Sequence, residues 1–234
     1  MPDLKIKGLQ KTSMVDYPPY IAATVFLAGC NFRCGYCYNR EIVFDEGDSF
    51  VSEKEFFQFL DKRKKWLDAV CITGGEPTLH TGLLKFMKKI KEKGILVKLD
   101  TNGTKPDVLR EVIEEKVVDY IAMDIKAQLN KYNEITNSKV DTKNIKKSVG
   151  IIRNSGINYE FRTTVVAGVV AKEDLLEIGE WLKGSRKYCI QQFVKAETML
   201  DESFKTKEQY TDDELKEFKK ILEPYFDEVE LRGI

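Results

Sequence analysis

The sequence lacks the features that mark secreted, membrane-spanning and disulfide-rich proteins. It has no run of about eighteen apolar residues, the minimum for a membrane-spanning helix. Its amino terminus has no apolar segment typical of a secretory signal. Cysteine is sparse and odd in number, 5 in 234 residues, which argues against a disulfide framework. We therefore expect a cytoplasmic protein with reduced thiols and no membrane partner.

A surplus of positive charge is also missing. Lys plus Arg and Asp plus Glu both number 38, so the formal net charge is zero. Proteins that bind nucleic acid normally carry a basic excess, and we expect no nucleic-acid partner. The basic run over residues 62–65 is interpreted as the solvated face of a helix.

Three of the cysteines lie close together in the chain. Cys30, Cys34 and Cys37 have the spacing C-x₃-C-x₂-C, after an apolar run over residues 21–29 that predicts a buried strand. A [4Fe–4S] cluster normally takes four thiolates, one for each iron. Because no fourth cysteine lies near, one iron would keep an open coordination position, where a metal site does chemistry. The pattern therefore predicts a reactive iron–sulfur cluster.

Two other uses of these cysteines remain open. Zinc sites usually combine such a pair with a second pair of Cys or His ligands, and the single histidine, His80, could complete a Cys₃His site. A plain electron-transfer iron–sulfur protein would use a similar loop, but it would normally supply a fourth cysteine. Cys71 and Cys189 fall inside predicted strands and are interpreted as core residues.

Short apolar segments alternate with amphipathic ones along the chain. The segments typical of strands are residues 21–29, 69–73, 95–99, 117–123, 159–166, 188–194 and a short 229–231. The segments typical of helices are residues 52–67, 81–93, 106–116, 142–155, 173–183 and 211–225. Strands that are each followed by a helix pair in parallel through right-handed crossovers.

Two α/β architectures fit this order, an open doubly wound sheet and a barrel of six strand–helix units. A complete barrel of eight units needs about 250 residues, so this chain can supply only part of one. The length fits a single domain over residues 1–234. Within it we expect an N-terminal extension over 1–20, a core over 21–200, and a C-terminal helix and short strand over 201–234.

Polar residues follow the predicted strands where each strand ends. The first predicted strand is followed by the cysteine loop. The next five are followed, in order, by Thr73–Pro77, Asp100–Gly103, Asp124–Lys126, Arg162–Thr163 and Gln191–Gln192. Taken singly, each could be an ordinary turn or a surface ion pair. Because the carboxyl ends of parallel strands meet at one edge, where such folds bind ligands, together they predict a site.

The cysteine loop, with Tyr36 before the third cysteine, and the Gly74-Gly75-Glu76 segment resemble the radical S-adenosylmethionine (SAM) superfamily. The resemblance covers nearly the whole chain and implies a partial, six-unit parallel β/α barrel. Further segments resemble the glycyl-radical-enzyme activases: Gly8–Lys11, Asp16–Pro18, Asp100–Gly103 and Asp124-x-Lys126. Among these the chain is most similar to the activating proteins of anaerobic ribonucleoside-triphosphate reductase, and the pyruvate formate-lyase activating enzymes are close relatives.

The resemblance implies roles for the site residues. The three cysteines would each hold one iron, and the fourth iron would chelate the amino and carboxylate groups of SAM. Backbone at Tyr36 would meet the adenine, Lys126 would bind the methionine carboxylate, and a monovalent cation could sit at the acidic residues with Thr101 and the Ala122 carbonyl. The catalytic set would be Asp100, Asp124 and Lys126. The cofactor-binding set would be Tyr36, Gly74, Gly75, Glu76, Asp100, Thr101, Asn102, Asp124, Lys126, Arg162 and Val194.

The resemblance also implies a reaction and partners. An electron from reduced flavodoxin or ferredoxin would enter the cluster and cleave SAM, giving methionine and a 5′-deoxyadenosyl radical. That radical would abstract a Cα hydrogen from a glycine of a partner glycyl radical enzyme, with anaerobic ribonucleotide reductase as the expected partner. A small-molecule or nucleoside-modifying member of the superfamily, such as a deazapurine synthase, is the alternative.

The sequence departs from the activases at two points. Many of them have histidine after the third cysteine, where this chain has Tyr38, and some carry a second cluster domain that is missing here. His80, near a predicted helix start, is interpreted as a structural cap rather than a proton carrier.

Overall fold

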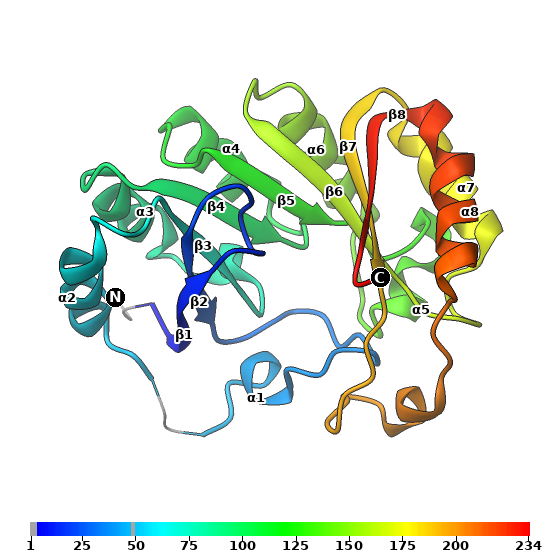
Figure 1. Cartoon of the computed structure of the whole chain (residues 1–234), viewed down its shortest axis with the longest axis horizontal. Coiled ribbons are helices and arrows are strands. Elements are labelled where there is room, and N and C mark those ends of the chain that lie inside the picture. The colour runs from blue at the N-terminus through cyan, green and yellow to red at the C-terminus, as the bar shows by residue number, and fades with distance from the viewer. Residues whose placement is uncertain (1–3, 48–49) are drawn as a thin grey trace. The chain divides into compact units, whose positions relative to one another are not determined.

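The computed structural model describes residues 4–47 and 50–234, and the chain folds into two compact units (Figure 1). The first unit comprises residues 4–31, 39–122 and 143–158. The second comprises Phe32–Tyr38, Met123–Thr142 and Tyr159–Ile234. The expectation of one domain over residues 1–234 stays a prediction, and residues 1–3 of the expected N-terminal extension lie outside the described residues.

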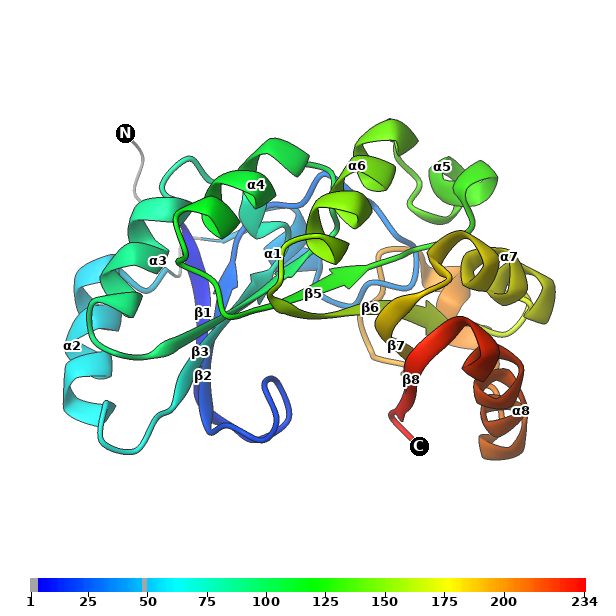
Figure 2. The same ribbon diagram turned by 90° about the horizontal axis from the view of Figure 1, so that it is seen from above.

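The first unit is built on four adjacent strands: β1 (Ile6–Ser13), β2 (Ala22–Leu27), β3 (Ala69–Gly74) and β4 (Leu96–Thr101). β1 is antiparallel to β2, whereas β2, β3 and β4 are parallel. The helices of this unit are α1 (Arg40–Val43), α2 (Glu53–Arg63), α3 (Leu83–Lys91), α4 (Pro106–Glu114) and α6 (Thr142–Arg153). Figure 2 shows α2, α3 and α4 along one side of these strands.

The second unit has three parallel strands in the order β6 (Asn158–Val165), β7 (Ser185–Gln192) and β8 (Phe226–Arg232). β5 (Tyr120–Asp124) carries the chain from the first unit into the second. The helices here are α5 (Tyr132–Ile135), α7 (Lys172–Leu182) and α8 (Asp212–Leu222). α8 packs on β8 and α7 (Figure 1).

Apolar burial explains why these segments form these elements. All residues of β2 except Phe26 are buried, as expected for a parallel strand covered on both faces. On α3, Leu83, Phe86, Met87 and Ile90 recur at helical spacing and are at most 1% exposed. A capping box at Ser52 opens α2 and another at Thr211 opens α8, as the sequence predicts.

The six predicted strand–helix units are present, with element ends shifted by a few residues. β8 is longer than the predicted 229–231, and the short helices α1 and α5 were not predicted. β1 lies inside the predicted N-terminal extension, where polar residues such as Lys11 interrupt any apolar alternation. Cys71 and Cys189 are buried in strands, which confirms their assignment to the core.

No helix in residues 4–47 and 50–234 is both long enough and apolar enough to cross a membrane.

Candidate functional site

The Gly74-Gly75 turn at the end of β3 is pressed against the chain just before Cys30. The Gly75 amide donates to the Leu27 carbonyl at 2.8 Å, and the Glu76 amide donates to the Gly29 carbonyl at 2.8 Å. Gly74 has φ +115°, and a Cβ on Gly75 would lie 2.0 Å from the Gly29 oxygen. Only glycine fits here, so the turn fixes the stem from which the cysteine loop leaves the first unit.

Glu76 joins the ends of two strands. Its Oε1 accepts from the Thr78 amide at 3.0 Å, from the Thr78 hydroxyl, and from the Thr101 hydroxyl at 2.8 Å. Its Oε2 accepts from the Asn102 amide at 2.6 Å. Burial raises the pKa of this fully buried carboxyl, and the four donors oppose that rise. Within the part of the chain that the structure describes, neutral donors therefore hold the acid. Thr78 was not singled out from the sequence.

The Asp100–Gly103 segment at the end of β4 is bonded internally and to the cysteine loop. The Asn102 side-chain amide donates to the Asn31 side-chain oxygen at 2.8 Å, and the Asn31 side-chain amide donates to the Thr104 hydroxyl at 2.9 Å. Asn31 directly follows Cys30, so this contact is a second support for the loop stem. The Asp100 carboxylate lies 3.0 Å from the Lys98 ammonium.

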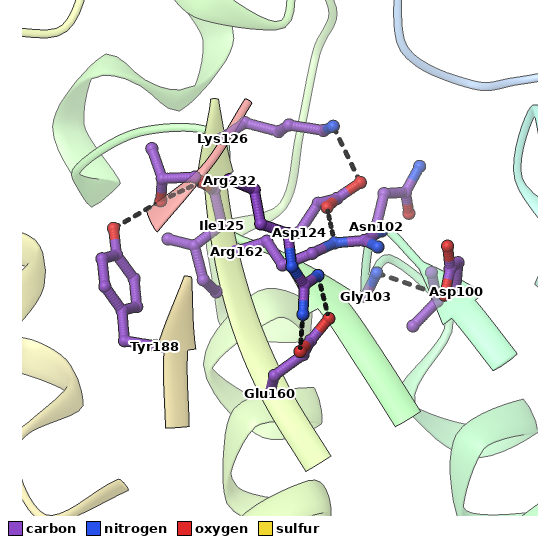
Figure 3. Close-up of polar contacts among 12 residues, drawn as sticks. Asp100, Asn102, Gly103, Asp124, Ile125, Lys126, Glu160, Arg162, Tyr188 and Arg232 are labelled. Atoms are coloured by element: carbon purple, nitrogen blue, oxygen red, sulfur yellow. Dashed lines mark hydrogen bonds and ion pairs between the residues drawn. The ribbon is translucent and has the colours of Figure 1, made fainter. Parts of the chain in front are cut away.

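In the second unit, the Asp124 carboxylate accepts hydrogen bonds from two cationic side chains. The Lys126 ammonium donates to its Oδ2 at 3.0 Å, and the Arg162 Nε donates to its Oδ1 at 2.8 Å (Figure 3). Burial by itself would raise the pKa of Asp124, but the two cations outweigh it and hold that pKa well below its usual range. Burial lowers the pKa of Lys126, and the Asp124 carboxylate outweighs it in the same way, so that this pKa is raised.

These three side chains carry a net charge of +1 in a largely buried place. The carboxylate and the two cations stabilise one another there, because a buried charge is costly unless it is paired. The predicted Asp124–Lys126 pair is therefore present, and Arg162 from β6 completes it. Behind it, the Thr163 hydroxyl donates to the Ile125 carbonyl at 2.7 Å and accepts from the Tyr188 hydroxyl at 2.6 Å (Figure 3).

The part of the cysteine loop in the second unit is fixed by backbone contacts. The Cys37 amide donates to the Cys34 carbonyl at 3.0 Å, which closes a tight turn. The Leu200 amide donates to the Cys37 carbonyl at 2.9 Å, and the Asp201 amide donates to the Gly35 carbonyl at 3.1 Å. A Cβ on Gly35 would lie 2.4 Å from the Phe204 ring. These contacts from residues 200–204 could not be read from the cysteine spacing.

The remaining predicted residues lie at or beyond this loop and strand. Tyr38 is exposed, and its carbonyl accepts from the Thr198 hydroxyl at 3.2 Å. Val194, two residues past the end of β7, is 55% exposed, and its place in the cofactor-binding set stays a prediction. His80 ends a 3-10 helix rather than starting a helix, and its Nε2 donates to the Ala28 carbonyl at 2.9 Å. Its assignment as a structural cap rather than a proton carrier stays a prediction.

The donor set fits an iron–sulfur cluster. All five cysteines are in the described residues, and no disulfide joins any of them. Cys34 is buried, and its thiol lies beside the buried Tyr36 hydroxyl. Residues 4–47 and 50–234 hold no group of three His, Cys, Asp or Glu side chains arranged around a single metal ion. A cluster differs from a single ion, because each thiolate binds a different iron.

Comparisons with known proteins show which family the chain is similar to. The profile of the Radical SAM superfamily matches residues 24–182. A Methanocaldococcus jannaschii protein, named provisionally as a glycyl-radical enzyme activating enzyme, is 36% identical over 234 residues, which cover 98% of this chain and 96% of that protein. The pyruvate formate-lyase-activating enzyme of Streptococcus mutans is 30% identical over 180 residues, which cover 70% of this chain and 67% of that enzyme.

A solved structure shows the same fold. SuiB of Streptococcus suis, determined with S-adenosylmethionine bound, superposes with a TM-score of 0.69 at 15% identity. The match covers 88% of this chain and 48% of SuiB, so the chain spans about half of that protein. The predicted fold class, a partial parallel β/α barrel of the radical SAM type, is thereby confirmed. With a family profile that matches more than half of its residues, the chain belongs to the radical SAM superfamily of enzymes.

Proposed function

We propose that this protein is an activating enzyme that abstracts a glycine Cα hydrogen from a partner glycyl radical enzyme. The observation that carries the proposal is the 36% identity to the M. jannaschii protein over 98% of this chain and 96% of that one. The similarity to the S. mutans activating enzyme supports the same activity. The expected partner is an anaerobic ribonucleotide reductase, and the expected reductant is a flavodoxin or ferredoxin.

Cys30, Cys34 and Cys37 would hold a [4Fe–4S] cluster, and SAM bound at its open iron would supply the one-electron chemistry. The chain itself must keep the three thiols in place. Cys30 leaves a stem held by the Gly74-Gly75 turn, and the Cys34–Cys37 turn is held by the Leu200 and Asp201 amides. Both supports are backbone contacts, so they do not depend on which side chains surround the cofactor.

The Asp124 group would bind the amino-acid part of SAM. Its net positive charge suits the methionine carboxylate, and the Lys126 ammonium can donate to that carboxylate while keeping its bond to Asp124. The ribose, sulfonium and adenine of SAM would contact the end of β4, at Asp100, Thr101 and Asn102. They would also contact the Tyr36 backbone and Val194. Gly74 and Gly75 would offer backbone groups to the methionine amino group.

Glu76 takes a different place in this proposal than the resemblance implies. Its two carboxylate oxygens already accept four hydrogen bonds, two of them from the turn it begins and two from the end of β4. We therefore assign Glu76 to positioning Thr101 and Asn102, which in turn face the cofactor. Asp100 already has the Lys98 ammonium beside it, at the place where the resemblance implies a monovalent cation.

The proposal is tested by anaerobic reconstitution of the full chain with iron and sulfide. The chain is then incubated with SAM, a reductant and a candidate partner whose carboxyl-terminal region carries a glycyl-radical segment. Electron paramagnetic resonance (EPR) should detect a glycyl radical in the partner. Cys37→Ala should abolish that signal, and Cys71→Ala, which alters a buried cysteine outside the motif, should retain it. Cleavage of SAM without a radical in any candidate partner would exclude the activase and favour a small-molecule substrate.

A further inference from the structure

We propose that Lys98 is a positioning residue whose buried ammonium is the built-in counter-cation of Asp100, in place of a bound monovalent ion. The inference deepens the proposed function, because it rests on Asp100 lying at the SAM site. It also explains a buried charge and a sequence segment, Asp16–Pro18, that the proposed reaction does not use.

Lys98 lies in the middle of β4 and is only 4% exposed. Lysine is almost never so buried unless its charge is paired. Lys98 and Asp100 are two residues apart on one strand, so both side chains project from the same face. The Lys98 ammonium lies 3.0 Å from the Asp100 Oδ1 and donates to the Asp16 carbonyl at 2.6 Å. Two partners from different segments thus fix the position of this ammonium.

The Asp16 carbonyl is itself held in place. The Asp16 amide donates to the Ser13 hydroxyl at 3.2 Å, and the Thr24 hydroxyl donates to the Asp16 carboxylate. The neighbouring Tyr17 is buried against Tyr20 and Tyr120, with ring centroids 5.0 and 5.4 Å apart. These contacts hold the turn between β1 and β2 beside Lys98, and they give the Asp16–Pro18 segment a structural purpose.

A tethered ammonium and a free ion give different behaviour in solution. A buried carboxylate that is not satisfied by several neutral donors, as Glu76 is, is stabilised by a positive partner. A free ion supplies one only when its concentration is sufficient. The Lys98 ammonium is part of the chain, so it is present at any concentration of monovalent ions. Binding of SAM beside Asp100 should therefore be insensitive to the identity of the monovalent cation in the buffer. An ion held by Asp100 and Thr101, as the resemblance implies, would make binding depend on it.

The test measures the dissociation constant of SAM on the reconstituted full chain, in potassium, sodium and tetramethylammonium chloride at equal ionic strength. The wild-type chain should bind SAM equally in all three. Lys98→Met should bind about tenfold more weakly in tetramethylammonium, because a buried charge pair is lost. Potassium or sodium should restore part of the affinity, since a small ion can approach the unpaired carboxylate. Lys91→Met, which removes the ion pair with Asp119 elsewhere in the same unit, is the matched control.

Two results would overturn the inference. One is a wild-type chain whose SAM affinity falls about tenfold when potassium and sodium are replaced by tetramethylammonium. This measurement needs no variant, so it decides even where Lys98→Met does not fold. The other is a folded Lys98→Met chain that binds SAM as the wild type does in every buffer. Both results are measured as SAM affinity and involve no partner protein. Failure of the activase proposal would instead appear as a missing glycyl radical in the partner, so the two failures can be distinguished.

Discussion

The two units each hold a carboxylate near the end of a strand, and they hold it by opposite means. Glu76 in the first unit is bound by neutral hydroxyl and amide donors, and burial raises its pKa. Asp124 in the second unit is bound by a lysine and an arginine, which outweigh the effect of burial and lower its pKa. Neutral donors tie two strand ends together through Glu76, whereas Asp124 fixes two cations where we propose that the carboxylate of a ligand binds.

The largest effect should come from Asp124→Asn. The substitution leaves the Lys126 and Arg162 cations without their counter-charge, so we expect a loss of about 3 kcal/mol in the free energy of unfolding. Urea denaturation of the variant measures it. Asp107→Asn is the control, because Asp107 is an exposed partner of Lys147 and its loss should cost less than about 1 kcal/mol. Equal losses in the two variants would remove the distinction between the buried group and a surface ion pair.

Glu76→Gln should have a smaller effect on stability. The amide keeps the shape of the side chain but turns one of the two acceptor oxygens into a donor. That donor faces either the Asn102 amide at the Oε2 position or the Thr78 and Thr101 donors at the Oε1 position. We expect a loss of about 2 kcal/mol. SAM binding by the folded variant should weaken with it, because the end of β4 loses its anchor. Unchanged stability with weaker binding would show instead that Glu76 contacts SAM directly.

The two carboxylates should respond to pH in opposite directions. Glu76 has a raised pKa in the fold, so the stability it contributes falls as pH rises above its usual value of about 4.5. Asp124 has a lowered pKa, so its contribution is present above about 3.8 and is lost as pH falls toward the folded value. In urea denaturation between about pH 3 and 8, the penalty of Glu76→Gln should therefore shrink toward high pH, and that of Asp124→Asn toward low pH. Parallel pH profiles would contradict this assignment.

The smallest effect should come from Thr101→Val. It removes one of the four donors to Glu76 while keeping the shape of the side chain, and we expect a loss of about 1 kcal/mol. A double-mutant cycle with Glu76→Gln isolates the shared bond. The losses should be non-additive, because the two residues contact each other. Strictly additive losses in the free energy of unfolding would show that Thr101 and Glu76 do not share this hydrogen bond.

The parts of the site that follow one strand or one loop could be predicted from the sequence. The cysteine spacing and the Asp124-x-Lys126 pair are local patterns, each within one loop or at one strand end. Contacts between distant segments could not be predicted. Asp201 and Phe204 reach the cysteine loop from more than 160 residues away, and nothing in the spacing of the loop indicates them. Lys98 was detectable, because a lysine two residues before an acid in an apolar strand shares its face.

The central claim is that a glycine of the partner enzyme donates the hydrogen atom. It is tested most directly with a partner whose glycine Cα carries deuterium, by following that deuterium into the product. After anaerobic reaction with this protein, reductant and SAM, mass spectrometry of the 5′-deoxyadenosine product should show one deuterium. The EPR signal of the labelled partner should at the same time lose the splitting caused by the Cα proton. Unlabelled 5′-deoxyadenosine, formed at the same rate with or without the partner, would contradict glycine as the hydrogen donor.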